Sequence, residues 1–143
     1  MPSVTDRDSE EALIVRAVLR LSRRLRMEAP SGDLSGGALG LLAALHRLGP
    51  MPAVALAEEE GLQPQSLTRL LQALEEAALI KRTPDPGDRR NRIITLTEQG
   101  KQVLRSTMRQ RRDWLAEAMT ERLSDDERAT LAEAAALMLR LAI

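Results

Sequence analysis

Apolar residues recur every three or four positions over much of the chain, which is the spacing of amphipathic helices. One such stripe runs from about Ser9 to Met27, and another follows Ser35, which stands where a helix cap would, and ends at Gly49. The stripes consist of Ile14, Val18, Leu21 and Leu25, and of Leu39, Leu41, Leu42, Leu45 and Leu48. The pattern predicts a half-polar first helix and a buried second helix.

The carboxy-terminal third predicts two more helices in direct succession. Thr97 stands where its hydroxyl can cap a long helix that runs to about Arg122. Ser124 and Glu127 then have the spacing of a capping box, in which each side chain satisfies the backbone of the other. Leu131 and Met138 lie on the apolar stripe of this last helix.

The middle of the chain has the order of a helix-turn-helix. A short helical pattern over 53–60 stops at Gly61, and Pro64 occupies the first position of a new helix, where its missing N–H costs nothing. The core-facing stripe of this helix is Leu67, Leu70, Leu71 and Leu74. Its other face carries groups that can read base edges or phosphates, so the predicted DNA-binding set here is Pro64, Gln65, Ser66, Thr68, Arg69 and Gln72.

A β-hairpin is predicted directly behind this helix, with strands at 79–82 and 92–96 around a Pro/Gly/Asp turn at 84–88. Its tip adds four residues to the predicted DNA-binding set: Asp88, Arg89, Arg90 and Arg92. Arginines on such a tip can enter a narrow minor groove, where the negative potential is strong, and Asp88 could hold a neighbouring guanidinium. An isolated charged turn is usually a solvated surface, but two groove-reading elements in this order favour a winged helix-turn-helix. The fold class is therefore mostly α with a small β-wing.

Specific runs of residues carry a resemblance to the MarR family of bacterial transcriptional regulators. They are the run from Leu74 to Arg82, Asp85-Pro86, Asp88-Arg89-Arg90, Leu96-Thr97-Glu98-Gln99-Gly100, Leu34-Ser35 and the run from Leu123 to Glu127. The resemblance implies a homodimer, often a repressor, that binds a palindromic operator. In the family a small ligand often weakens this binding to DNA. It also implies a recognition helix from Pro64 to Ala77 and an aspartate-x-arginine wing motif at Asp88 and Arg90.

Three positions depart from the family pattern. Ala78 replaces the common glycine after the recognition helix, Ala73 replaces a frequent basic residue, and Gln63 replaces the usual serine or threonine cap. An alanine in the left-handed conformation costs about 1 kcal/mol relative to glycine, so the helix is expected to end differently. The other two changes weaken the expectation of some phosphate contacts but leave the groove-facing set.

By its length the chain predicts one domain over 1–143, with the winged helix-turn-helix region at 35–97 flanked by dimerisation helices at 9–27 and 98–143. The apolar faces of the flanking helices exceed what the small winged domain can cover. A second copy related by a two-fold axis can cover them, so we expect an isologous homodimer.

The charge and the cysteine content restrict the ways in which the chain can bind DNA, sense an effector or hold a metal. Lys and Arg number 21, as do Asp and Glu, so no global positive field draws the chain to DNA, and specificity depends on placement. The absence of cysteine excludes thiol-based sensing, and a single histidine argues against a metal site. Without a nucleophile motif or a Gly-rich phosphate loop, the chain is not expected to be an enzyme.

Any effector is expected to be a small organic molecule bound non-covalently in a mainly aliphatic pocket, because Trp114 is the only aromatic residue. His46, Arg16 and Trp114 are its candidate ligand-binding residues, although a single histidine is more often structural and a tryptophan such as Trp114 more often belongs to an interface core. No cofactor and no metal are predicted. The polar stretch 2–8 shows no signal peptide and no apolar run is long enough to span a bilayer, so we expect the cytoplasm.

A different class of function also fits the sequence. A winged-helix module that binds protein or dimerises without reading DNA would be consistent with zero net charge and with Ala73. Such a module has no need of the Arg89/Arg90 tip. A gel-shift with the protein's own upstream DNA separates the two hypotheses.

Overall fold

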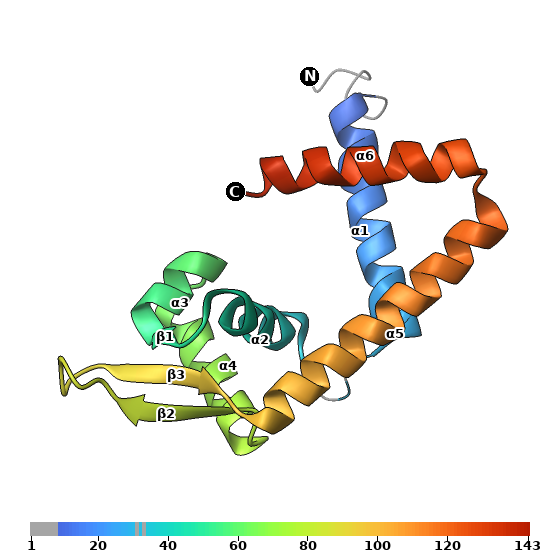
Figure 1. Cartoon of the computed structure of the whole chain (residues 1–143). Coiled ribbons are helices and arrows are strands. Elements are labelled where there is room, and N and C mark those ends of the chain that lie inside the picture. The colour runs from blue at the N-terminus through green and yellow to red at the C-terminus, as the bar shows by residue number, and fades with distance from the viewer. Residues whose placement is uncertain (1–8, 31, 33) are drawn as a thin grey trace. The chain divides into compact units, whose positions relative to one another are not determined.

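The computed structural model describes residues 9–30, 32 and 34–143. The polar stretch at 2–8 and two positions of the loop before the second helix, Ser31 and Asp33, lie outside the described residues. The chain divides into two compact units, residues 30–108 and the remainder, which we call the winged unit and the terminal-helix unit. In chain order (Figure 1) the elements are α1 (Glu10–Glu28), α2 (Gly36–Leu48), β1 (Met51–Pro52), α3 (Ala53–Glu60), α4 (Pro64–Glu76), β2 (Ile80–Pro84), β3 (Arg92–Leu96), α5 (Glu98–Arg122) and α6 (Asp125–Leu141).

The winged unit combines three helices and the start of α5 with an antiparallel sheet in the order β1-β3-β2. The predicted hairpin is β2 and β3, with Ile80 opposite Leu96 and Pro84 opposite Arg92. No sequence pattern predicted β1, a two-residue strand that pairs Met51 with Ile94. It ties the start of α3 to the hairpin.

One apolar core holds the winged unit together. Its side chains with essentially no exposure come from α2, α3, α4 and β3: Leu41, Leu42, Leu56, Leu71, Leu74 and Ile94. The predicted burial of α2 is confirmed except at Leu48, which is 49% exposed. Leu48 is the last residue of α2, beyond the turn that packs on the core, and the chain leaves the helix at Gly49 with φ +88°.

Helix caps fall where the sequence places them. Ser35 Oγ accepts the Ala38 N–H at 3.1 Å, and Thr97 Oγ1 accepts the Gly100 N–H at 3.0 Å. The capping box of α6 is complete, with Ser124 and Glu127 bonded in both directions. The backbone N–H of Ser124, and then its hydroxyl, lower the pKa of the exposed Glu127 carboxyl, because both donate to its charged form.

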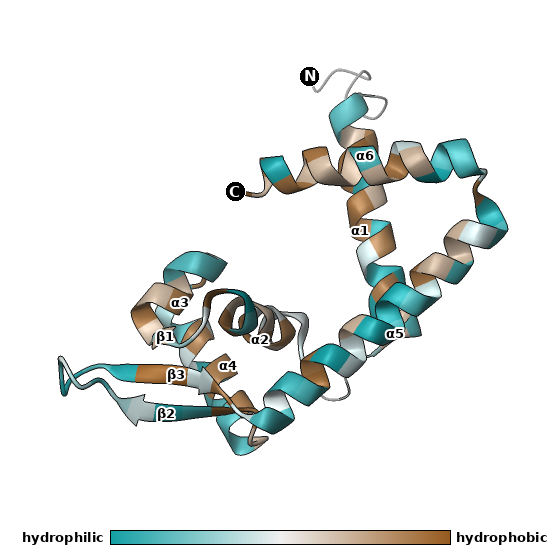
Figure 2. Cartoon of the chain, viewed as in Figure 1, coloured by the Kyte–Doolittle hydropathy of each residue, from teal (hydrophilic) through white to brown (hydrophobic). Residues whose placement is uncertain are grey.

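The terminal-helix unit contains α1, α6 and the later part of α5, and it has almost no core of its own. Ala29 is its one buried residue within the described range, and Arg111 Nε donates to the Ala29 carbonyl at 3.2 Å. The ribbons of α1 and α6 contain hydrophobic segments, drawn brown in Figure 2. The large apolar side chains that remain exposed on these two helices are Leu13, Ile14, Val15, Val18, Leu19, Leu21, Met27, Leu131, Leu137, Met138, Leu139 and Leu141. No described helix is both long enough and apolar enough to cross a membrane.

Candidate nucleic-acid interface

The turn between α3 and α4 is tightly made. Gly61 ends α3 with φ +61°, and the Leu62 N–H reaches back to the Ala57 carbonyl at 2.9 Å, which closes the helix end. Pro64 is the first residue of α4, as predicted, and the side chain of Gln63 makes no capping hydrogen bond. The amino-terminal N–H groups of α4 therefore donate no hydrogen bond to a cap side chain, which leaves them for an external acceptor.

The outward face of α4 presents the predicted residues. Gln65, Ser66 and Arg69 are exposed, as are Thr68 and Gln72. The last two have partners inside the helix, since the Thr68 hydroxyl donates to the Pro64 carbonyl at 2.9 Å and Gln72 Nε2 donates to Glu76 Oε1 at 3.3 Å. The side chains of the first three are thus the most available for base contacts.

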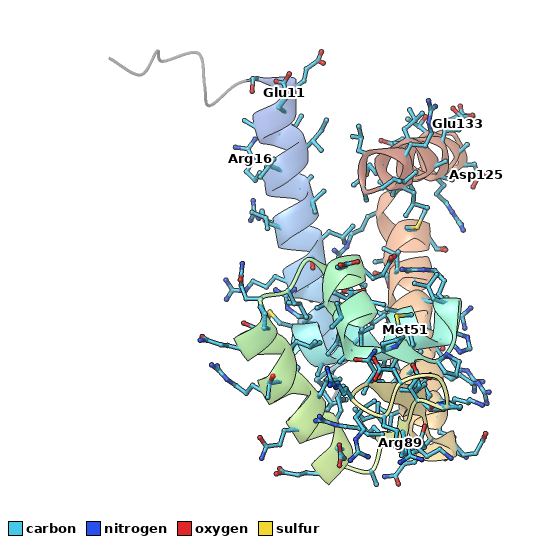
Figure 3. The ribbon with its side chains drawn as sticks, turned by 90° about the vertical axis from the view of Figure 1, so that its left-hand side faces the viewer. Glu11, Arg16, Met51, Arg89, Asp125 and Glu133 are labelled. Carbon is cyan, nitrogen blue, oxygen red and sulfur yellow. The ribbon has the colours of Figure 1, made fainter. Side chains whose placement is uncertain are left out.

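The hairpin tip is ordered by two aspartates. Asp85 Oδ1 accepts the Gly87 N–H at 2.9 Å, and Asp88 Oδ1 accepts the backbone N–H of Arg90 at 3.0 Å. Asp88 thus fixes the backbone of the turn, and the prediction that it holds a neighbouring guanidinium is wrong. Arg89 and Arg90 are exposed on the tip, and the side chain of Arg89 is labelled in Figure 3, where the hairpin points towards the viewer.

Arg92 differs from the other predicted wing residues in its location. It is the first residue of β3, opposite Pro84, and it lines a groove between the hairpin and the last turn of α4. It is exposed, but it belongs to the paired part of the hairpin and not to the tip.

The end of α4 corrects the expectation drawn from Ala78. The helix runs Pro64–Glu76 with Ala77 as its cap, and Ala78 adopts φ +61°, the left-handed conformation that glycine would take. The Leu79 N–H bonds to the Leu74 carbonyl at 2.9 Å and the Ala78 N–H to the Glu75 carbonyl at 3.0 Å, the bond pair of a glycine-type ending. The alanine does not change how the helix ends; it makes the same ending strained.

The start of α5 is bonded to this strained turn. The Thr97 hydroxyl donates to the Ala78 carbonyl at 2.7 Å, and the Thr97 N–H donates to the Leu79 carbonyl at 3.1 Å. Gly100 follows one turn later and lies against the same Leu79 carbonyl. These contacts join the end of α4 to the first turn of α5, so the direction of α4 is set by α5 as well as by the core.

The strain at Ala78 leads to a stability prediction. Ala78→Gly is expected to raise the free energy of unfolding by about 1 kcal/mol, since glycine has no Cβ to strain a left-handed residue. Ala77→Gly is the matched control, because Ala77 has φ −79° and gains nothing from glycine. Urea unfolding measures both. A stabilisation by Ala77→Gly equal to that by Ala78→Gly would contradict the assignment of strain.

The candidate ligand residues are divided between the two units. His46 is exposed in the last turn of α2, in the winged unit, whereas Arg16 and Trp114 belong to the terminal-helix unit. Trp114 is half-buried on α5, with the guanidinium of Arg24 5.8 Å from the centre of its ring. The sequence did not predict that Arg24 lies against Trp114. No metal-binding group of acidic, histidine or cysteine residues occurs in the part of the chain that the structure describes.

A helix-turn-helix with an exposed second helix, followed by an arginine-tipped hairpin on the same core, defines a winged helix-turn-helix DNA-binding protein. Residues 34–91 match the model of the MarR family. An uncharacterised HTH-type transcriptional regulator of Mycobacterium bovis is 38% identical over 125 residues, which are 87% of each chain.

Solved structures agree with this class. A Pseudomonas aeruginosa protein described as a transcriptional regulator is 36% identical, with 96% of this chain and 98% of that chain covered and a TM-score of 0.80. Wild-type MarR of E. coli, in its apo form, has the same fold at 23% identity, with 92% and 96% covered and a TM-score of 0.82. The chain belongs to the MarR family of helix-turn-helix transcriptional regulators, and it is not an enzyme.

Proposed function

We propose that this regulator is a homodimeric repressor that binds a palindromic operator and is released by a small, non-covalently bound organic molecule. The observation that carries the DNA-binding part is the construction of the winged unit. One core positions both the exposed face of α4 and the arginine tip of the hairpin, and Thr97 bonds the end of α4 to α5.

In this proposal α4 reads the major groove. Gln65, Ser66 and Arg69 contact base edges or phosphates, because their side chains are exposed near the start of the helix. Thr68 and Gln72 lie on the same side of the helix. They add contacts to DNA when they exchange their hydrogen bonds within the helix for bonds to the duplex. Pro64 brings the helix start to the backbone of the duplex.

The wing reads the minor groove. Arg89 and Arg90 project from a turn whose backbone is held by Asp88, so two cations are presented on an ordered support. A contact of this kind responds to groove width and potential more than to base identity. It should therefore add affinity with less sequence preference.

A second copy of the chain is proposed as the cover for α1 and α6. Neither helix has a buried residue, although both carry many large apolar side chains. A two-fold partner would bury these faces and would place two copies of α4 against half-sites about 34–36 Å apart.

The proposed effector is a weak organic acid or another largely apolar molecule. His46, Arg16 and Trp114 are the candidate contacts, and the chain has no cysteine through which oxidation could act. A coupling of about 1–3 kcal/mol between effector and DNA is the usual size for such linkage. We place the protein in the cytoplasm, where an operator in bacterial DNA would be found.

Two arginine variants test whether α4 reads bases while the wing contributes affinity with little sequence preference. The probe is a duplex that the wild-type protein selects from a random pool. Arg69→Ala is expected to weaken binding by about 1–3 kcal/mol and to change the preferred bases, as a base-edge contact would. Arg90→Ala is expected to weaken binding to all duplexes more evenly, as a minor-groove contact would.

Arg140→Ala, in the last turn of α6, removes the same charge as a control and should leave binding unchanged. Equal affinity of wild type and Arg90→Ala at low and moderate salt would refute the role of the wing. Failure of the wild type to select any sequence would favour a protein-interaction module instead.

A further inference from the structure

The recognition helix α4 has an unfavourable charge distribution for a DNA-binding element. Arg69 is its only basic residue, whereas its last turn carries Glu75 and Glu76 and no basic residue. The carboxyl end of a helix already bears a partial negative charge, which these carboxylates reinforce. The negative end of the helix dipole therefore disfavours these two carboxylates, and together they repel the phosphates of DNA unless a nearby cation neutralises them.

The inner face of the hairpin supplies cations at this place. Because side chains alternate along a strand, Ile80, Arg82 and Pro84 share one face of β2. Their partners in register are Leu96, Ile94 and Arg92, so these lie on the same face of β3. Ile80, Ile94 and Leu96 are buried in the core. Arg82 and Arg92 continue this inward face beyond its apolar part.

The arginines and the carboxylates meet in one groove. Arg82 Nε lies 2.5 Å from Glu75 Oε2, and this Nε atom is buried with no hydrogen bond of good geometry to any described residue. Arg92 lines the same groove, of about 630 Å³, together with Gln72, Glu75, Glu76 and Arg82. The Arg82 side chain is only 31% exposed, so loss of the Glu75 carboxylate would leave a partly buried cation without its counter-charge.

We propose that Arg82 and Arg92 are positioning residues: they neutralise the acidic end of α4 from the groove between this helix and the hairpin, and so hold the wing at a fixed angle to the recognition helix. Arg82 acts through its ion pair with Glu75, and Arg92 acts through the field of the two carboxylates in the shared groove. This assigns Arg92 a different role from the DNA contact expected from the sequence. The inference rests on the proposed DNA binding.

The salt dependence of binding separates this role from a phosphate contact. A cation that contacts a phosphate releases a counterion, so its removal lowers the slope of log affinity against log salt by about one. A cation paired inside the protein releases none. Its removal should leave the slope unchanged while it loosens the wing and weakens discrimination between sequences.

The experiment compares two duplexes, one that the wild type selects from a random pool and one with the same bases in scrambled order. Arg82→Gln and Arg92→Gln are each expected to keep the wild-type salt slope. Arg82→Gln should lower the selected-to-scrambled affinity ratio by about three- to tenfold, which lies within the range found for coupled residues, and Arg92→Gln by less.

Glu75→Gln, unlike the two arginine variants, is expected to change the salt slope. The freed Arg82 guanidinium becomes available to phosphates, so the slope steepens by about one and affinity for the scrambled duplex rises. The Glu75→Gln/Arg82→Gln double variant should lower the ratio no further than Arg82→Gln alone. Glu121→Gln, which removes an exposed carboxylate from α5 in the terminal-helix unit, is the charge-matched control and should change neither quantity.

Several results would overturn the proposal. A slope reduced by about one in Arg82→Gln with an unchanged ratio would make Arg82 a phosphate contact. Additive losses in the double variant would show that Glu75 and Arg82 are not coupled. If thermal melting shows that Arg82→Gln is unfolded, the double variant Glu75→Arg with Arg82→Glu, which swaps the two charges, decides. It is expected to restore the fold and the selected-to-scrambled affinity ratio. Failure to restore them contradicts the pairing. A wild type that selects no sequence overturns the proposed function itself, which is a distinct outcome.

Discussion

The Gly100→Ala variant is expected to unfold at a markedly lower temperature than the wild type. A Cβ atom at Gly100 would lie 2.1 Å from the carbonyl oxygen of Leu79 and 3.0 Å from its carbonyl carbon, and this backbone cannot rotate away as a side chain could. Forcing one extra carbon into a packed site costs typically about 1–3 kcal/mol and sometimes more. Thermal and urea unfolding measure the loss, and operator affinity should fall with it, because the contact joins α4 to α5.

Gly36→Ala provides the matched control. Gly36 also lies in the first turn of a helix, but apart from its chain neighbours and its own helix backbone no described residue has an atom within 4 Å of the position its Cβ would take. Alanine there should leave stability unchanged or raise it by up to about 1 kcal/mol, since alanine is the better helix former. A loss of stability in Gly36→Ala as large as in Gly100→Ala would show that the close approach to Leu79 is not the cause.

Met138→Asp is expected to split the proposed homodimer. Met138 lies on the apolar stripe of α6 and is 39% exposed in a single chain. A charge buried there against a second copy would have no counter-charge, and an uncompensated buried charge costs about 3–5 kcal/mol. Size-exclusion chromatography with light scattering should show a monomer or an unfolded chain, and affinity for a full palindrome should fall.

Ala136→Asp introduces the same charge about half a helical turn away, on the face of α6 opposite to Met138, and should leave the assembly intact. Both variants need the oligomeric state and the DNA affinity measured at the same protein concentration. A Met138→Asp protein that is a stable monomer and still binds the palindrome as tightly as the wild type would exclude α6 from the interface.

Features that depend on neighbouring residues could be predicted from the sequence. Pro64 at the first position of α4, the caps at Ser35 and Thr97, and the box formed by Ser124 and Glu127 are all present in the structure. Each rests on a hydrogen bond or a backbone preference within four residues. The β3 strand, Arg92–Leu96, was predicted with its bounds because a turn of strong sequence preference precedes it.

Features that depend on distant residues could not be predicted. The strand β1 is two residues long and exists because Met51 meets Ile94, far along the chain. Ala78 keeps φ +61° against its own preference because the core, Leu74 and Thr97 hold the turn from several sides.

The same distinction applies to the candidate site. The exposed residues of α4 follow from helical spacing, whereas the groove against the wing does not. Glu75 and Arg82 are separated by the helix ending, and only the register of β2 against β3 shows that Arg82 and Arg92 share a face. Asp88 was given the wrong partner because a sequence does not distinguish a guanidinium from a backbone N–H as the donor.

The nearly coreless terminal-helix unit has a consequence for how much of this regulator a cell must hold. If a second copy supplies the missing core of α1 and α6, folding of these helices is coupled to association and depends on protein concentration. Below the dissociation constant of the dimer, the chains would expose their apolar helices to proteases at the same time as they leave the operator. Dilution by growth or a pause in synthesis would then end regulation abruptly, through removal of the protein itself.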